Sequence, residues 1–219
     1  MNHFKKFLIL FVFSWNFSAH AGAFEDFFSA FINDDASVVQ ALLERGFDPN
    51  GVDEKGTPAL VKAVNESSSK IFQVLVNWPK IRVNDPNPSG ESALMLAAIK
   101  GRLDWVKALV ERDADVNMPG WTPLHYAASK GHIDVMRELI EHHAYIDAPS
   151  PNGTTPLMMA AHYGTPAATK LLLEEGADPT LKNQKELTAR DFAYGANQIL
   201  SAQYIEAFLA AWSAKSKPQ

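Results

Sequence analysis

The sequence contains no cysteine, which excludes disulfide bonds, thiolate zinc sites and cysteine nucleophiles. It also lacks the phosphate-binding pattern Gly-x-x-x-x-Gly-Lys and the Gly-x-Ser-x-Gly turn of many hydrolases. Positive charge is sparse, because 20 Lys and Arg residues stand against 25 Asp and Glu, and no basic run follows Lys5-Lys6. A protein that binds a phosphate backbone needs clustered positive charge, so we expect no nucleic-acid partner.

No apolar run approaches the ~20 residues that a membrane-spanning helix needs. A shorter run at residues 7–13 follows Lys5-Lys6 and precedes the small-residue segment Ala19-His20-Ala21. This order is typical of a secretory signal peptide, with an uncleaved anchor as the alternative. We predict that residues 1–21 are a signal peptide removed after Ala21, with Ala23 as the second choice. The mature protein would then keep no stable membrane anchor.

What the sequence does contain is a repeated unit, clearest at residues 120–141. Leu124, Ala127 and Ala128 lie on one face of a predicted helix, and this face is apolar but slender. Gly131 ends the helix where a left-handed residue is needed. The helix that follows has an apolar stripe formed by Ile133, Met136, Leu139 and Ile140. Neither helix can bury its apolar face alone, which predicts packing between units.

Imperfect copies of this unit recur at intervals of 30 to 34 residues. The residues that take the place of Gly120 in them are Gly56, Gly90, Gly153 and Glu186. The interval before Gly120 is the shortest, which predicts a short loop there. Thr122-Pro123-Leu124-His125, Ala127-Ala128 and Gly131-His132 together resemble the signature of the ankyrin repeat family. With its signal peptide, the chain resembles exported bacterial ankyrin repeat proteins, which predicts a periplasmic location.

The resemblance implies an all-α fold, a solenoid of helix-turn-helix units joined by short β-hairpin loops. We place the ankyrin repeat domain at residues 22–212 and a polar tail at residues 213–219. The domain is expected to consist of an N-terminal cap at 24–50, repeats at 51–84, 85–117, 118–147 and 148–180, and a C-terminal cap at 181–212.

The resemblance also assigns structural roles to the residues of the motif. These residues are Thr122, His125, Gly131 and Thr155. The family pattern implies that the ring of His125 forms a hydrogen bond with the hydroxyl of Thr122. We therefore expect the motif histidine to stabilise the fold and not to act in catalysis.

In ankyrin arrays, the residue after the first glycine and the two before the inter-helix glycine face the concave groove. Together with residue chemistry, this rule predicts a partner-binding surface formed by Glu91, Lys100, Trp121, Lys130, Thr154, His162 and Tyr163. Trp121 and Tyr163 are the expected anchors, because Trp and Tyr are enriched among binding hot spots. Local packing of Trp121 on Met118 and Pro119 is the alternative.

We expect the protein to bind another protein, of unknown identity, through the concave face formed by its hairpins and first helices. One alternative is an inhibitor or immunity-type protein that neutralises a secreted or envelope enzyme. Another is an enzyme with an unrecognised site. His142 and His143 are adjacent on a helix and cannot chelate one ion from ideal geometry. We therefore expect no catalytic residue, no metal and no cofactor.

Overall fold

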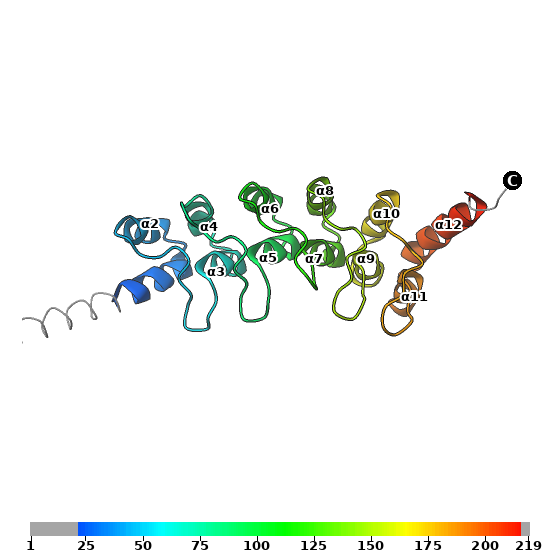
Figure 1. The fold of residues 1–219 in the computed structure, drawn as a ribbon, viewed down its shortest axis with the longest axis horizontal. Helices are drawn as coiled ribbons and strands as arrows, with labels where there is room; N and C mark the ends of the chain where they lie inside the picture. The colour runs from blue at the N-terminus through cyan, green and yellow to red at the C-terminus, as the bar shows by residue number, and fades with distance from the viewer. Residues whose placement is uncertain (1–21, 216–219) are drawn as a thin grey trace, which may run out of the picture. The chain divides into compact units, whose positions relative to one another are not determined.

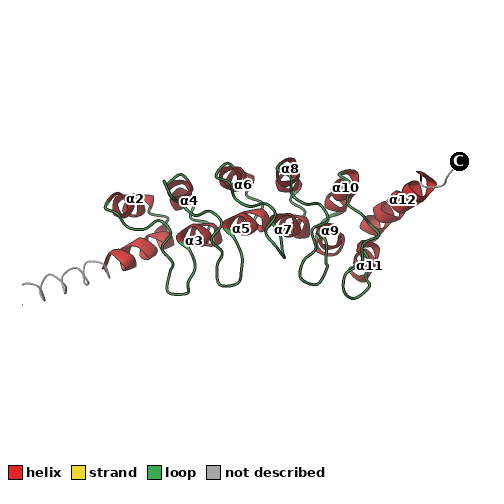
Figure 2. Ribbon diagram, in the orientation of Figure 1, coloured by secondary structure: helices red, strands yellow, loops and turns green. Residues whose placement is uncertain are grey.

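The computed structural model describes residues 22–215, with side chains up to residue 211. The chain divides into two compact units, one ending at Gly90 and the other beginning at Glu91, which we describe separately. The regular elements of the described part are helices (Figure 2), so the predicted all-α fold is confirmed. Within that part, no helix is long and apolar enough to cross a membrane. The predicted signal peptide, residues 1–21, lies outside the described residues.

The first unit begins with a helix over residues 22–29. It continues with the 3-10 helix η1 (Ala30–Asn33) and the helices α2 (Ala36–Glu44), α3 (Ala59–Glu66) and α4 (Ser69–Val76). Phe27 and Phe31 are buried, and the ring of Phe27 stacks on that of Phe47 with centroids 4.4 Å apart. These aromatic side chains build the core of the segment for which the sequence predicts an N-terminal cap.

The second unit consists of helix pairs. They are α5 (Ala93–Ile99) with α6 (Leu103–Val110), α7 (Pro123–Lys130) with α8 (Ile133–Glu141), α9 (Pro156–Tyr163) with α10 (Pro166–Glu174), and α11 (Ala189–Gly195) with α12 (Ile199–Lys215). The first helices α5, α7, α9 and α11 pack on one another in order, and the second helices form a layer beside them (Figure 1). Because α12 extends to Lys215, it includes part of the predicted polar tail.

Small residues allow the first helices to approach closely. Their fully buried alanines are Ala93, Ala97, Ala98, Ala127, Ala128, Ala160, Ala161 and Ala193. The turn into α8 is equally tight at Gly131, which has a φ of +69°. A Cβ atom added there would lie 2.6 Å from Cγ2 of Thr165, so both backbone conformation and space require glycine. The close packing inside this unit therefore leaves no room for larger side chains at these positions.

The loops between repeats differ from the expected β-hairpins. Within residues 22–215 there is no strand, and an isolated bridge joins Val52 and Pro58. Side chains close the loop tips instead: Oδ1 of Asn183 accepts hydrogen bonds from the N–H groups of Lys185 and Leu187. A backbone bond from Asn183 N to Leu187 O completes this turn at 3.0 Å. Because the side chain holds the tip, paired strands are not needed to close the loop.

Side-chain amides link consecutive loops within each unit. Oδ1 of Asn117 accepts from the N–H of Tyr145 at 2.7 Å, and its Nδ2 donates to the carbonyl of His143 at 2.9 Å. Asn50 makes the same pair of bonds with the N–H of Arg82 and the carbonyl of Lys80. An amide is suited to this position because it both accepts and donates.

In the next repeat, Asp147 occupies the position that Asn117 has in its own repeat. Its carboxylate oxygens lie 3.1 and 3.2 Å from the backbone nitrogen of Asp178. An ionised carboxylate cannot donate to the carbonyl two residues earlier, that of Gly176. Burial is the main cause that raises the pKa of Asp147, and the charge of Asp178 adds to it. The folded state therefore disfavours the ionised form of this side chain.

We expect Asp147→Asn to stabilise the protein by about 0.5–1.5 kcal/mol at neutral pH, because the amide adds a donor and removes a half-buried charge. The urea midpoint of unfolding measures this change. Glu54→Gln, which removes a carboxylate charge at an exposed position in a turn, should leave the midpoint nearly unchanged. Because the pKa of Asp147 is raised, the advantage should shrink as the pH falls and the wild-type carboxyl becomes protonated. A lower midpoint for Asp147→Asn would contradict the assignment.

Candidate functional site

His125 links helix α7 to the following repeat. Its ring is fully buried, and Nδ1 lies 2.9 Å from Oγ1 of Thr122 and 3.1 Å from the backbone nitrogen of Thr122. Nε2 lies 2.9 Å from the carbonyl oxygen of Thr154. A carbonyl can only accept, so Nε2 carries the proton and Nδ1 accepts from Thr122. His125 therefore caps its own helix and donates a hydrogen bond to its neighbour.

Burial lowers the pKa of His125 to about 4. The imidazole is consequently neutral at pH 7, and both of its ring nitrogens are engaged in hydrogen bonds. A general acid or base works best with a pKa near the operating pH and with a free path to its substrate. His125 meets neither condition, so its place in the structure is that of a structural residue.

Thr155 begins α9 as Thr122 begins α7. Oγ1 of Thr155 accepts a hydrogen bond from the backbone N–H of Met158 at 3.3 Å. Met158 holds the position that His125 holds in α7, and its sulfur lies 3.4 Å from the backbone nitrogen of Thr155. A thioether is a weak acceptor without a proton to donate, so it cannot bond to a carbonyl of the next unit.

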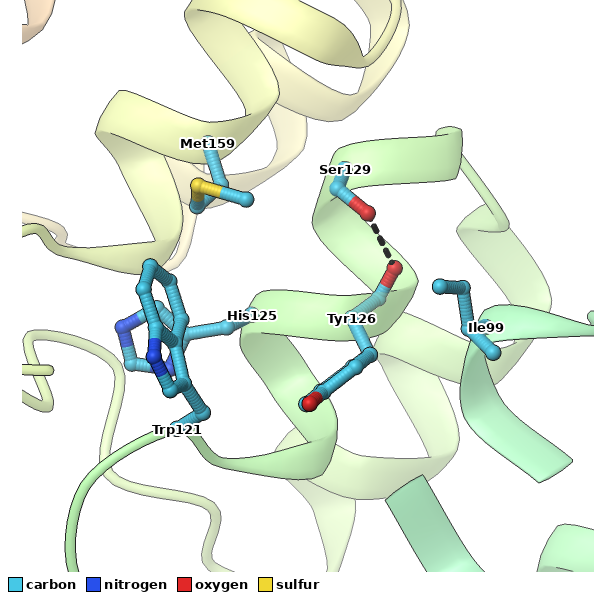
Figure 3. Close-up of a pocket in the computed structure, with 6 residues that line it drawn as sticks. All are labelled: Ile99, Trp121, His125, Tyr126, Ser129 and Met159. Carbon is cyan, nitrogen blue, oxygen red and sulfur yellow. Dashed lines mark hydrogen bonds between the residues drawn. The ribbon is translucent and has the colours of Figure 1, made fainter. Parts of the chain in front are cut away.

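Trp121 stands at the entrance of a small hollow beside His125. The two rings meet edge to face, with centroids 5.2 Å apart, so Trp121 packs on His125. This neighbour is additional to Met118 and Pro119, the packing partners suggested by the sequence. The hollow, which we call the Trp121 pocket, has a volume of about 220 Å³ and is lined by Ile99, Trp121, His125, Tyr126, Ser129 and Met159 (Figure 3). Met159 of α9 lies across from Trp121, so two neighbouring repeats of the second unit form the walls of the pocket.

A larger depression, which we call the long groove, includes this region and continues towards α11. Its volume is about 600 Å³. It is lined by Ile99, Trp121, Ser129, Lys130, Asn152, Thr154, Met159, Tyr163, Asn183, Lys185, Leu187 and Phe192. The lining is largely apolar, with amide groups and lysines among it, which suits a binding surface.

Several residues of the predicted partner surface line the long groove. Trp121 is half-buried there, Lys130 is exposed, and Tyr163 is 62% exposed. Thr154 also borders the groove, but it is only 3% exposed and its carbonyl is occupied by His125. Thr154 therefore offers a partner little surface, contrary to its predicted role. The following loop covers this turn, since a Cβ atom added at Gly153 would lie 3.3 Å from Cα of Asn183.

The other members of the predicted surface lie outside the groove lining. Glu91 accepts a hydrogen bond from Oη of Tyr126 at 3.4 Å. Burial and this neighbouring carboxylate raise the pKa of Tyr126. His162 stacks on Tyr163 with ring centroids 4.1 Å apart, so it supports the orientation of that tyrosine. Lys100 is exposed at the C-terminal end of α5 and does not line the groove.

The structure adds residues that sequence reasoning did not select. Two of them, Ile99 and Ser129, fit the positional rule for the concave face without having been chosen for the partner surface. The others are Tyr126, Asn152, Met159, Asn183, Lys185, Leu187 and Phe192. A usable signal existed for Leu187, because it follows Glu186 as Trp121 follows Gly120. Treating the last copy as a cap hid that correspondence. Met159 could not be distinguished, because its neighbour Met158 is equally apolar and is fully buried.

The hydroxyl of Ser129 and the imidazole of His125, at the Trp121 pocket, are committed to structural bonds. Oγ of Ser129 donates to the carbonyl of Tyr126 at 2.8 Å (Figure 3). His125 is bonded at both ring nitrogens, to Thr122 and to Thr154. Across the described part of the chain, no cluster of three or more His, Asp or Glu side chains is placed to hold a metal ion. The arrangement therefore offers shape and apolar area to a ligand.

The comparison with protein families agrees with this geometry. A family model described as "Ankyrin repeats (3 copies)" matches residues 27–119 and 117–183. The chain belongs to the ankyrin repeat family. Ankyrin repeats of this kind form protein–protein interaction modules, so this ankyrin repeat protein has a protein as its expected class of partner.

Curated relatives of this ankyrin repeat protein come from animals and from a bacterium. "Ankyrin repeat and SAM domain-containing protein 6" of Rattus norvegicus is 29% identical over 143 residues, which is 65% of this chain and 13% of the relative. "Nuclear factor NF-kappa-B p105 subunit" of Gallus gallus is 32% identical over 165 residues, or 72% of this chain and 17% of the relative. "Putative ankyrin repeat-containing protein" of Treponema pallidum is 25% identical over 171 residues, or 77% of this chain and 47% of the relative. The chain thus spans less than half of each of these proteins.

Proposed function

We propose that this ankyrin repeat protein binds another protein through the long groove over α7, α9 and α11. The observation that carries the proposal is the open, largely apolar groove on the first-helix layer, with partly exposed aromatic side chains. The imidazole of His125 and the hydroxyl of Ser129 are already bonded within the chain, which favours binding over chemistry. The family of the chain supports the same conclusion.

Trp121 and Tyr163 are the proposed anchors of the interaction. Trp121 is held edge to face on His125, and Tyr163 is held by stacking on His162. An aromatic side chain that is already positioned loses little conformational entropy on binding. Such residues often dominate the binding free energy of an interface.

We expect Trp121→Ala to weaken partner binding by about 2 kcal/mol or more, which corresponds to about thirtyfold in affinity. A pull-down from periplasmic extract would supply the partner, and calorimetry would measure its affinity for each variant. Tyr145→Ala is the matched control, because Tyr145 is 59% exposed and lies outside the long groove. If Trp121→Ala lowered the melting temperature and left the affinity unchanged, Trp121 would be a packing residue and the binding surface would lie elsewhere.

We also propose that the protein is exported to the periplasm. The support is the sequence of residues 1–21, in which basic, apolar and small residues follow one another. N-terminal sequencing of protein from a periplasmic extract should find Gly22 as the first residue. Intact Met1 in protein from the cytosolic fraction would rule out this proposal.

A further inference from the structure

The long groove differs in charge from the chain as a whole. The chain carries a formal net charge of −5, yet none of the residues that line the groove is acidic. Two of them, Lys130 and Lys185, are exposed lysines. An acidic protein therefore presents a groove with a positive border.

These lysines also differ from many others in the chain. Lys62 bonds to Asp53 and Glu66, while Lys170 and Lys182 each meet a glutamate four residues along. Within residues 22–215, no carboxylate lies within ion-pair distance of Lys130 or Lys185. Their charges are thus available to a ligand in the groove.

The Trp121 pocket limits what else the ligand can carry. Its volume is about 220 Å³. Because a cavity of about 150 Å³ holds one benzene molecule, the pocket has room for one large apolar side chain and not for two. Trp121, Ile99 and Met159 provide an apolar lining, and the hydroxyl of Ser129 is already bonded. The pocket would therefore select an aromatic or branched aliphatic residue.

We infer that the occupant of the long groove is an extended acidic segment of the partner protein, with one large apolar side chain seated in the Trp121 pocket. This inference rests on the proposed function and specifies the chemistry of the partner. Acidic residues beside the anchor would meet Lys130 and Lys185. Two segments of this chain are poor occupants: residues 22–29 form a helix whose Phe27 is already buried, and residues 213–219 carry Lys215 and Lys217 without an acidic residue.

An unbiased library of displayed peptides, selected on the purified protein, tests the inference. Enriched sequences should contain one large apolar residue flanked by Asp or Glu. Met159→Trp, which fills the Trp121 pocket, should abolish their binding. Enriched sequences that are neutral or basic would overturn the inference, and so would the absence of enrichment over a blank surface.

Charge reversal gives a second, independent readout on exposed residues that do not support the fold. Fluorescence anisotropy with a synthetic copy of an enriched peptide should show that Lys130→Glu with Lys185→Glu weakens binding by roughly tenfold or more, mainly through slower association. Lys55→Glu with Lys80→Glu is the control, because it makes the same charge change at exposed residues outside the groove. Equal loss in both pairs would overturn the inference, as would self-association of the chain that the groove variants abolish.

The natural partner distinguishes this inference from the proposed function. Suppose that Trp121→Ala weakens binding of the natural partner, that Lys130→Glu with Lys185→Glu does not, and that acidic peptides fail to compete with the partner. Then only the chemistry inferred for the segment is wrong. If Trp121→Ala also leaves the affinity for the partner unchanged, the groove is not the binding surface of the partner.

Discussion

Removal of residues 181–219 is expected to unfold or aggregate the protein. The cut deletes α11 and α12, which pack on α9 and α10. It exposes apolar residues of α10 such as Leu171 and Leu172, which are 3% and 0% exposed in the intact chain. Burying one such side chain stabilises a protein by roughly 1.5–3 kcal/mol, and a typical domain has a margin of about 5–15 kcal/mol.

A polar bond is lost in the same cut. Oγ1 of Thr169 donates to Oγ of Ser201 at 3.2 Å, and both residues are fully buried. Without Ser201 the threonine hydroxyl would face water on a newly apolar surface. We therefore expect the melting temperature to fall by about 10 °C or more.

Circular dichroism and size-exclusion chromatography measure the effect of the truncation. A cut that removes only residues 216–219 serves as the control and should leave stability unchanged. If the protein without residues 181–219 remained monomeric and equally stable, α11 and α12 would not form a C-terminal cap.

His125→Ala should destabilise the protein by about 1–3 kcal/mol or more. Partner affinity should fall only together with this loss of stability, because the ring also supports Trp121. The substitution leaves the carbonyl of Thr154 and the N–H of Thr122 without their bonds to the ring, inside a buried site. It also leaves a cavity where the ring was, which adds to the loss. His142→Ala is the matched control, because the His142 side chain is 49% exposed.

The same residue predicts a pH dependence of stability. The pKa of His125 is about 4 when folded and about 6.5 when unfolded, so below pH 6.5 the unfolded chain binds more protons than the folded one. The free energy of unfolding that the neutral, buried ring contributes is fully present above pH 6.5. Up to about 3 kcal/mol of it is lost as the pH falls towards 4. Urea midpoints at pH 7 and pH 5 should differ more for the wild type than for His125→Ala. Selective loss of binding in His125→Ala, with unchanged stability, would refute the structural role.

The candidate site was only partly predictable from the sequence. Position within the repeat led to Trp121, Lys130 and Tyr163, because each unit repeats the same geometry and equivalent positions face the same way. It failed at Thr154, since burial of the loop depends on how tightly the next turn folds over it. Met159 and Phe192 join the groove through packing between units, which no single repeat encodes.

The sequence by itself determined the helices, their order and the family. The apolar periodicity, Gly131 and the motif beginning at Thr122 act locally, over one or two turns of helix, so one-dimensional patterns carry them. Only the tertiary structure decided that the loops lack strands, that His125 bonds to Thr154, and that an uncharged pocket lies between Trp121 and Met159. These features depend on distances between residues about 30 positions apart, which packing sets and local sequence does not.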